Sequence, residues 1–216
     1  MIGTFLPRVI AGMAAVVSTA GLASAQVPVG SFDGAVKVTT RYDVTAAMAD
    51  CMLVRDHGNA GNLVMVPGND WGRAYRKVSV TLENCMKTDG SVTMSAPELR
   101  GILAERLLID RDRLLLRQAA AMASSPAARV ATVEREHWQD PVFDCVARSE
   151  PAKAAALFGH AVATPGEAAA FRSLIPTLQA CTPLGAGFKM KPGEVRPRVA
   201  ISLYRQLVAT SGGATL

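Results

Sequence analysis

The segment "CMKTDGSVTMSAPELRGILAERLL" (residues 85–108) returns later in the chain as "CTPLGAGFKMKPGEVRPRVAISLY" (residues 181–204). Both segments open on a cysteine, and no gap is needed to align them from there. Five positions then coincide 96 residues apart (181 − 85): Met94 with Met190, Glu98 with Glu194, Arg100 with Arg196, Ala104 with Ala200, and Leu107 with Leu203. Matches at one fixed offset from a cysteine indicate that a structural unit is written twice in this chain.

The similarity extends to the residues before these cysteines. "MADCMLVR" aligns with "VFDCVARS", and "VTLENC" aligns with "PTLQAC". The two cysteines lie 34 positions apart in the first copy (85 − 51) and 36 in the second (181 − 145), with a Pro-Gly pair between them. We therefore predict a helical repeat at 41–122, a linker rich in small residues at 123–135, a second helical repeat at 136–208 and a disordered tail at 209–216.

Local signals in both copies favour helices. In the first copy a helix is expected near 45–54, and the Gly- and Asn-rich "RDHGNAGN" that follows is expected to weaken it. In the second copy "SEPAKAAALFG" predicts one helix. A capping box formed by Thr164 and Glu167 predicts the start of the next, which should end near Cys181.

The last helix of each copy opens on the aligned segment. It is expected to begin after the cap Ser95 in the first copy and near Glu194 in the second. The charged "IDRDR" (109–113) interrupts the apolar stripe of the first of these helices and indicates a bend. Apolar residues two apart in "DGSVTMS" and "GAGFKMK" leave room for one very short β ribbon after the second cysteine of each copy.

The N-terminus carries the pattern of a secretory signal. Arg8 precedes an apolar stretch that ends in "ASA", so residues 1–25 are expected to be removed before Gln26, and residues 26–40 to form a flexible segment. The apolar stretch is shorter than the ~20 residues that span a bilayer, although an uncleaved anchor is the alternative. We expect a periplasmic or secreted protein with no membrane span after signal removal.

All four cysteines lie in the part of the chain that is expected to be exported: Cys51, Cys85, Cys145 and Cys181. An even number of cysteines in an oxidising compartment predicts two disulfides. Pairing within each copy is favoured because a duplicated unit had to fold alone before duplication, although pairing across the copies is also allowed. No C-x-x-C spacing supports zinc binding or thiol exchange, so no metal and no cofactor is expected. The predicted fold class is mainly α, built from two tandem disulfide-stapled helical repeats.

Six polar residues recur in both copies and are candidates for a site: Asp50, Glu98 and Arg100 in the first copy, and Asp144, Glu194 and Arg196 in the second. Residues two apart on a helix face different ways, so the Glu-x-Arg pairs form no acid–base dyad. The glutamates suit the first turn of a helix, and the arginines can brace the preceding loop or pair with the aspartates. Because the set is symmetric, we interpret it as architecture, with a binding site as the alternative.

The three histidines, His57, His137 and His160, do not recur between the copies. The sequence contains no nucleophile elbow, no zinc-protease motif and no phosphate-binding loop around them. They are therefore expected to be exposed or capping residues, and no catalytic residue is assigned. The alternative is a hydrolase that uses His57 or His137 as a general base.

The combination of motifs resembles a group of uncharacterised exported bacterial proteins with a duplicated two-cysteine helical unit. The resemblance rests on "DCMLVR", "VPG", "LENC" and "LRGILAERL", and then on "DCVAR", "TPG", "LQAC" and "VRPRVAISLYRQL", and it covers most of residues 41–208. The chain departs from the pattern between Arg55 and Pro67 and again at Ile201-Ser202. The resemblance implies a duplicated helical architecture and export of the protein, and it implies no particular activity.

The function we expect is that of an exported, non-catalytic protein that binds a partner or an envelope component. A formal charge of +5, or +4 once the signal with its one arginine is removed, is mildly basic and suits anionic envelope surfaces without specifying them. Nucleic acid is not expected as a partner, because the chain has no Lys/Arg runs and few aromatic residues. The alternatives are the hydrolase and a structural or stress-protective envelope protein.

Overall fold

The computed structural model describes residues 41–66, 71–86, 94–131, 139–186, 190 and 192–211. These residues are mainly helical, contain no strand and carry both disulfides, so the predicted fold class is confirmed. Most of the stretch expected to form the β ribbon lies outside the described residues, as do the expected signal, the N-terminal segment and most of the tail.

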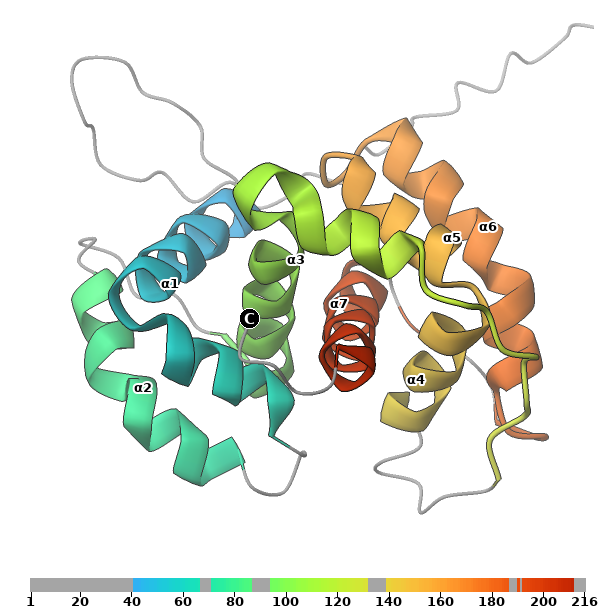
Figure 1. Cartoon of the computed structure of the whole chain (residues 1–216), viewed down its shortest axis with the longest axis horizontal. Coiled ribbons are helices and arrows are strands. Elements are labelled where there is room, and N and C mark those ends of the chain that lie inside the picture. The colour runs from blue at the N-terminus through green and yellow to red at the C-terminus, as the bar shows by residue number, and fades with distance from the viewer. Residues whose placement is uncertain are drawn as a thin grey trace, which may run out of the picture.

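Unit 1 consists of three helices, α1 (Arg41–Met65), α2 (Trp71–Cys85) and α3 (Ala96–Ala120), with α1 packed between the other two (Figure 1). The first helix is longer than expected. The backbone leaves the helical region only at Asp56 (φ −153°, ψ 61°), and the helix resumes directly after it. The Gly- and Asn-rich segment therefore bends the helix instead of ending it, because Ala60, Leu63 and Val64 within it are buried in the core.

Unit 2 follows the same order with one more break. Its elements are α4 (Gln139–Ser149), α5 (Pro151–Ala156), the 3-10 turn η2 (Leu157–Gly159), α6 (Pro165–Cys181) and α7 (Pro192–Thr210). Glu150, which separates α4 from α5, has φ −137° and ψ 58°, close to the values at Asp56. The two residues lie 94 positions apart, the same offset as Cys51 and Cys145, so the two units bend at the same place.

The two units meet along their last helices. In Figure 1, α3 and α7 lie side by side at the centre, with α1 and α2 on one flank and α4, α5 and α6 on the other. Their closest approach is at Gly101, where an added Cβ would overlap the Cβ of Pro197 and lie 2.5 Å from its Cα. Residues 101 and 197 are equivalent in the alignment (101 + 96), so equivalent positions touch each other, as they do on a two-fold axis.

The start of α7 differs slightly from expectation. The helix begins at Pro192 instead of near Glu194, because a proline is readily accepted in a first turn. Pro197 consequently lies beyond the first turn of α7, where its missing N–H removes one helical hydrogen bond. Its ring faces the position where α3 has only a glycine, so the two helices cross with their backbones close together.

The predicted bend in α3 is confirmed. Arg113 has φ 59°, in the left-handed region, and the helix after it turns across α7 toward α5 (Figure 1). After Ala120 the chain runs as an extended strap over unit 2. The strap is held by hydrogen bonds from the Ser125 amide to the Arg148 carbonyl (2.9 Å) and from the Val130 amide to the Cys181 carbonyl (3.0 Å). The described part of the expected linker is thus fixed to unit 2.

The disulfides join Cys51 to Cys85 and Cys145 to Cys181, which confirms the pairing within each copy. They differ in exposure. Cys51 and Cys85 are half-buried, whereas Cys145 and Cys181 are 3% and 0% exposed. The strap also covers the second disulfide, because the Ala128 carbonyl oxygen lies 3.2 Å from the Cys145 sulfur.

Under native conditions, mild thiol reductant is expected to open the unit 1 disulfide at least about tenfold faster than the unit 2 disulfide, because exchange requires in-line access to a sulfur. Alkylation followed by peptide mass mapping at several times measures both rates. In guanidinium chloride the two rates should converge. Equal rates in the native protein would show that the strap does not protect the second disulfide.

Candidate functional site

Arg100, the first arginine of the repeated segment, is buried, with 6% of its surface exposed. Its Nη2 donates to the carbonyl oxygens of Val64 (3.2 Å) and Val66. Arg205 of α7 reaches the same two carbonyls, with its Nε 3.0 Å from the oxygen of Val64 and its Nη2 2.7 Å from that of Val66. The last carbonyls of a helix have no partner within the helix, so these arginines cap the end of α1.

Arg196, the equivalent arginine in unit 2, is also 6% exposed and also caps. Its Nη1 donates to the carbonyl oxygens of Leu157 (3.1 Å) and His160 (3.3 Å), which follow α5. His160 is equivalent to Val66 (66 + 94), so both arginines hold the same turn in their own units. This shared role supports the interpretation of the repeated arginines as architecture.

Arg196 additionally contacts two carboxylates. Glu105 crosses from α3 of unit 1, with its Oε1 2.6 Å from Nη2 and its Oε2 3.0 Å from Nε of Arg196. Glu167 of α6 lies 2.8 Å from Nη1. The hydroxyl of Tyr42 donates to Oε1 of Glu105 at 2.5 Å. These four side chains, which we call the central network, tie α1 and α3 of one unit to α6 and α7 of the other.

Two members of the central network, Tyr42 and Arg196, have raised pKa values. Burial, followed by the charge and hydrogen bond of Glu105, raises the pKa of the Tyr42 phenol far above its ordinary value. Burial works to lower the pKa of Arg196, but the hydrogen bonds and charges of Glu105 and Glu167 outweigh it, so the pKa is raised. Tyr42 and Arg196 therefore keep their protons near neutral pH, and their contacts join the two units.

Arg100 differs from Arg196 in its electrostatic surroundings. The position equivalent to Glu105 is Ile201 (105 + 96), so no carboxylate crosses to Arg100 from α7. Within the described residues its Nε has no hydrogen-bond partner. Burial lowers the pKa of Arg100, and the charge of Asp140 opposes that shift. The two units therefore share a capping arginine but only one of them balances its charge with a buried glutamate.

The aspartates beside the cysteines contact other residues than the arginines of the repeated segment, so the alternative in which these arginines pair with the aspartates is wrong. Asp50 forms a two-point ion pair with Arg106, with distances of 2.5 and 2.8 Å. Asp144 lies against Ser202, the residue equivalent to Arg106. Burial raises the pKa of Asp144, and the Ser202 hydrogen bond partly offsets this. The capping arginines bind helix-end carbonyls instead. The aspartates pair with Arg106 and Ser202, which lie six positions further along α3 and α7.

The glutamates of the repeated segment occupy first helical turns, as expected. Glu98 closes a capping box with Ser95, because its Oε2 accepts from the Ser95 amide (2.7 Å) while its own amide donates to the Ser95 hydroxyl. Burial works to raise the pKa of Glu98, but the bonds to Ser95 outweigh it and lower the pKa. Arg41 lies 3.0 Å from Glu98 at the surface. Glu194 is exposed in the first turn of α7.

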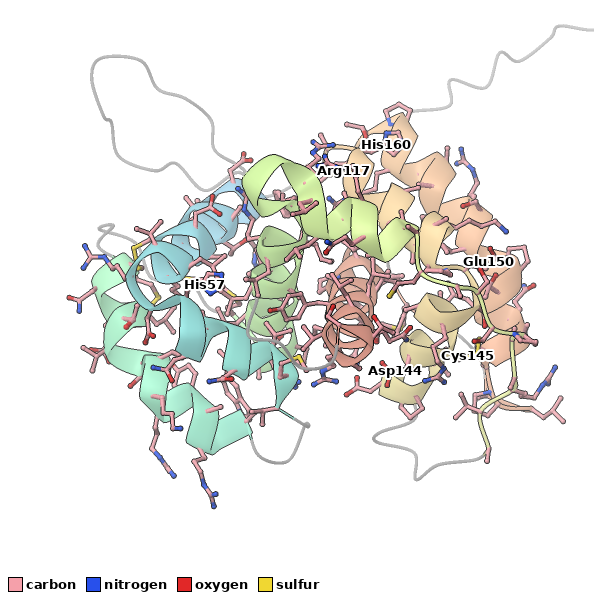
Figure 2. The ribbon with its side chains drawn as sticks, in the orientation of Figure 1. His57, Arg117, Asp144, Cys145, Glu150 and His160 are labelled. Atoms are coloured by element: carbon pink, nitrogen blue, oxygen red, sulfur yellow. A yellow bond between two sulfur atoms is a disulfide. The ribbon has the colours of Figure 1, made fainter. Side chains whose placement is uncertain are left out.

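The described histidines, His57 and His160, lie in different units, and both are exposed (Figure 2). The neighbouring Asp56 accepts hydrogen bonds from Asn59. The ring of His160 packs on Gly166 in the first turn of α6. His137 lies outside the described residues. Within the described residues no hydrogen bond or ion pair involves the side chain of either histidine, and the use of His57 or His137 in catalysis stays an untested alternative.

An open hollow of about 530 Å³ lies under the strap of unit 2. Strap residues 124–127 form one wall, and α5 and α6 form the others. Its two charged side chains, Glu150 and Lys153, pair with each other at 2.9 Å. The hollow therefore offers hydroxyl groups and apolar walls to a ligand but no net charge.

One charged feature of unit 1 is only partly matched in unit 2. Four exposed residues of α2 lie on one side of the helix and are called the basic face here: Arg73, Arg76, Lys77 and Val80. Spacings of three, four and seven residues place them on one stripe, and the opposite side, with Ala74, Val78 and Leu82, is buried against α1. None of the three cations is paired with a carboxylate within the described part of the chain.

The corresponding helix of unit 2 is different. Helix α2 carries three cations and one acid, a net charge of +2, whereas α6 carries Arg172 and Glu167, a net charge of zero. The residues at the positions of Arg73 and Lys77 are Ala169 and Ser173 (73 + 96, 77 + 96), whereas the position of Arg76 is again an arginine, Arg172 (76 + 96). Helix α6 takes the equivalent place in unit 2 with only one of these cations. The basic face is therefore not required for the fold of such a unit.

Sequence reasoning missed Glu105 and the basic face, although both left signals. Glu105 is surrounded at three and four positions by Ile102, Leu108 and Ile109, so it stands on an apolar face, where a charge needs a buried partner. The basic face is visible as cations at helical spacing opposite an apolar stripe. Both features lie at positions where the two copies differ, so a comparison that selects repeated residues does not select them.

Comparisons of the chain with protein-family models, with curated proteins and with solved structures found no match. Among the described residues no helix has the length and apolar character needed to cross a membrane. The same residues bring no three His, Cys, Asp or Glu side chains together as a metal site.

Proposed function

We propose that this is an exported, non-catalytic binding protein that recognises an anionic component of the cell envelope through the basic face of α2. The observation that carries the proposal is the cluster of three exposed cations on α2, of which α6 of unit 2 keeps only the counterpart of Arg76, Arg172. The two disulfides are compatible with an oxidising compartment, and export itself rests on the signal pattern at residues 1–25. The resemblance to exported proteins with a duplicated unit, itself a proposal, agrees with this assignment.

The geometry supports a surface interaction. Both arginines of the repeated segment and both disulfides contribute to the fold, whereas the outer side of α2 is exposed in the part of the chain that the structure describes. Exposed cations attract anionic surfaces over a distance of about one Debye length, roughly 8–10 Å at physiological salt. Binding through this face is therefore expected to be reversible and sensitive to ionic strength.

Sedimentation with isolated envelope fragments tests the proposal. The basic-face variant, Arg73→Gln with Arg76→Gln and Lys77→Gln, is expected to lose binding by about tenfold or more at low salt. The matched control removes three exposed cations from unit 2: Arg129→Gln, Arg148→Gln and Arg172→Gln. The control lowers the net charge by the same amount. If both variants lost the same amount of binding, net charge alone would explain the loss, and binding through the basic face would be contradicted.

A further inference from the structure

The cations of the basic face diverge from one another. Arg73, Arg76 and Lys77 are exposed on a convex helix surface and lie, with Val80, within eight residues or about 10 Å of helix length, and the exposed Glu83 follows on the same stripe. A single small anion is bound by donors that converge on it in a concave site. Diverging cations on a convex stripe are suited instead to an extended array of negative charges.

An exposed apolar side chain lies on the same stripe. Val80 is 66% exposed at the end of the basic face, and Val54, on α1 of the same unit, is 88% exposed. An acidic polysaccharide offers a valine no apolar partner, whereas the boundary between headgroups and acyl chains does. The aromatic rings of α2 that could stack on sugars or bases, Trp71 and Tyr75, stack on each other at 4.7 Å and pack against the core.

We infer that the basic face docks on the surface of an anionic lipid bilayer, with its cations among the phosphates and Val80 at the headgroup boundary. This inference rests on the proposed function and names its ligand. The buried side of α2 stays packed on α1 through Ala74, Val78 and Leu82, so unit 1 keeps its fold and the protein lies on the bilayer without inserting a helix.

Cosedimentation of the protein, purified after export, with vesicles tests the inference. Vesicles of phosphatidylcholine with about 30% phosphatidylglycerol are expected to bind it, and vesicles of phosphatidylcholine alone are not. Each cation near an anionic surface is worth about fivefold in partitioning, so the basic-face variant should bind about 100-fold more weakly. Val80→Ser should weaken binding about fivefold at every salt concentration, because it removes an apolar contact and no charge.

The controls separate this inference from the proposed function. The unit 2 control variant should bind anionic vesicles within about threefold of the unchanged protein, and a larger loss would overturn docking by one face. If envelope fragments bind through the basic face but anionic vesicles do not, the lipid inference fails, the proposed function stands and an acidic polymer or protein becomes the ligand. If neither binds, both are wrong. Since every substituted side chain is exposed, unchanged circular dichroism is expected throughout.

Discussion

Replacing Arg196 by methionine is expected to lower the free energy of unfolding by about 3–5 kcal/mol. The substitution leaves the carboxylates of Glu105 and Glu167 without their cation at a site where Glu105 is only 2% exposed. A buried charge that loses its partner keeps its desolvation cost, and the carbonyls after α5 lose their donors as well. Denaturant unfolding of the oxidised protein, followed by circular dichroism, measures the loss.

Arg100→Met is the matched control for this substitution. It removes an equally buried arginine from the equivalent position, but Arg100 donates only to the Val64 and Val66 carbonyls, which Arg205 also contacts. The expected cost is about 1–2 kcal/mol. Adding Glu105→Leu to Arg196→Met should recover about 1 kcal/mol or more, since it removes an unpaired buried charge. Equal costs for the two arginines would show that carbonyl capping, and not the ion pair between the units, stabilises the fold.

Gly101→Ala is expected to destabilise the protein by about 1–3 kcal/mol, although alanine is the better helix former. The new methyl group would overlap the Cβ of Pro197 and lie 2.5 Å from its Cα and 2.9 Å from its carbonyl oxygen. Backbone atoms of a buried helix cannot rotate away, so α3 and α7 must separate along the contact that joins the units. The drop in melting temperature and in the denaturant midpoint measures the effect.

The same substitution at Gly58 provides the control. Gly58 lies within α1, and an added Cβ there would meet nothing within 4 Å. Gly58→Ala should therefore stabilise the protein by about 0.5–1 kcal/mol through helix propensity alone. Opposite signs at the two glycines are the expected result. A neutral or stabilising Gly101→Ala would contradict the close crossing of the central helices.

Much of the fold was predictable because its signals are local. The capping box at Ser95 and Glu98, the bend within "IDRDR" and the end of α6 at Cys181 depend on residues a few positions apart. The disulfide pairing followed from the duplication, since each unit carries its own two cysteines. The end of the first helix was missed, because burial of Ala60 and Leu63 overrides the weak helix propensity of the glycines around them.

The candidate site was harder to predict than the fold. Sequence comparison of the copies selected Glu98, Arg100, Glu194 and Arg196, and the structure assigns capping to both arginines and to Glu98. Their partners lie tens of residues away: Glu105 is 91 positions from Arg196. Nothing in a local pattern states which distant carboxylate will face a given guanidinium, because that depends on how two helices cross.

The sequence by itself determined the helical class, the two disulfide-bonded units and the pairing of their disulfides, because each of these follows from spacing along the chain. Only the tertiary structure decided that the units join through α3 and α7, that Gly101 meets its own equivalent Pro197, and that Glu105 of one unit neutralises Arg196 of the other. These contacts are formed between residues about 90–100 positions apart, and buried charges and close backbones are set by packing in three dimensions. It also decided which charges form contacts inside the fold and which, on the outer side of α2, are exposed.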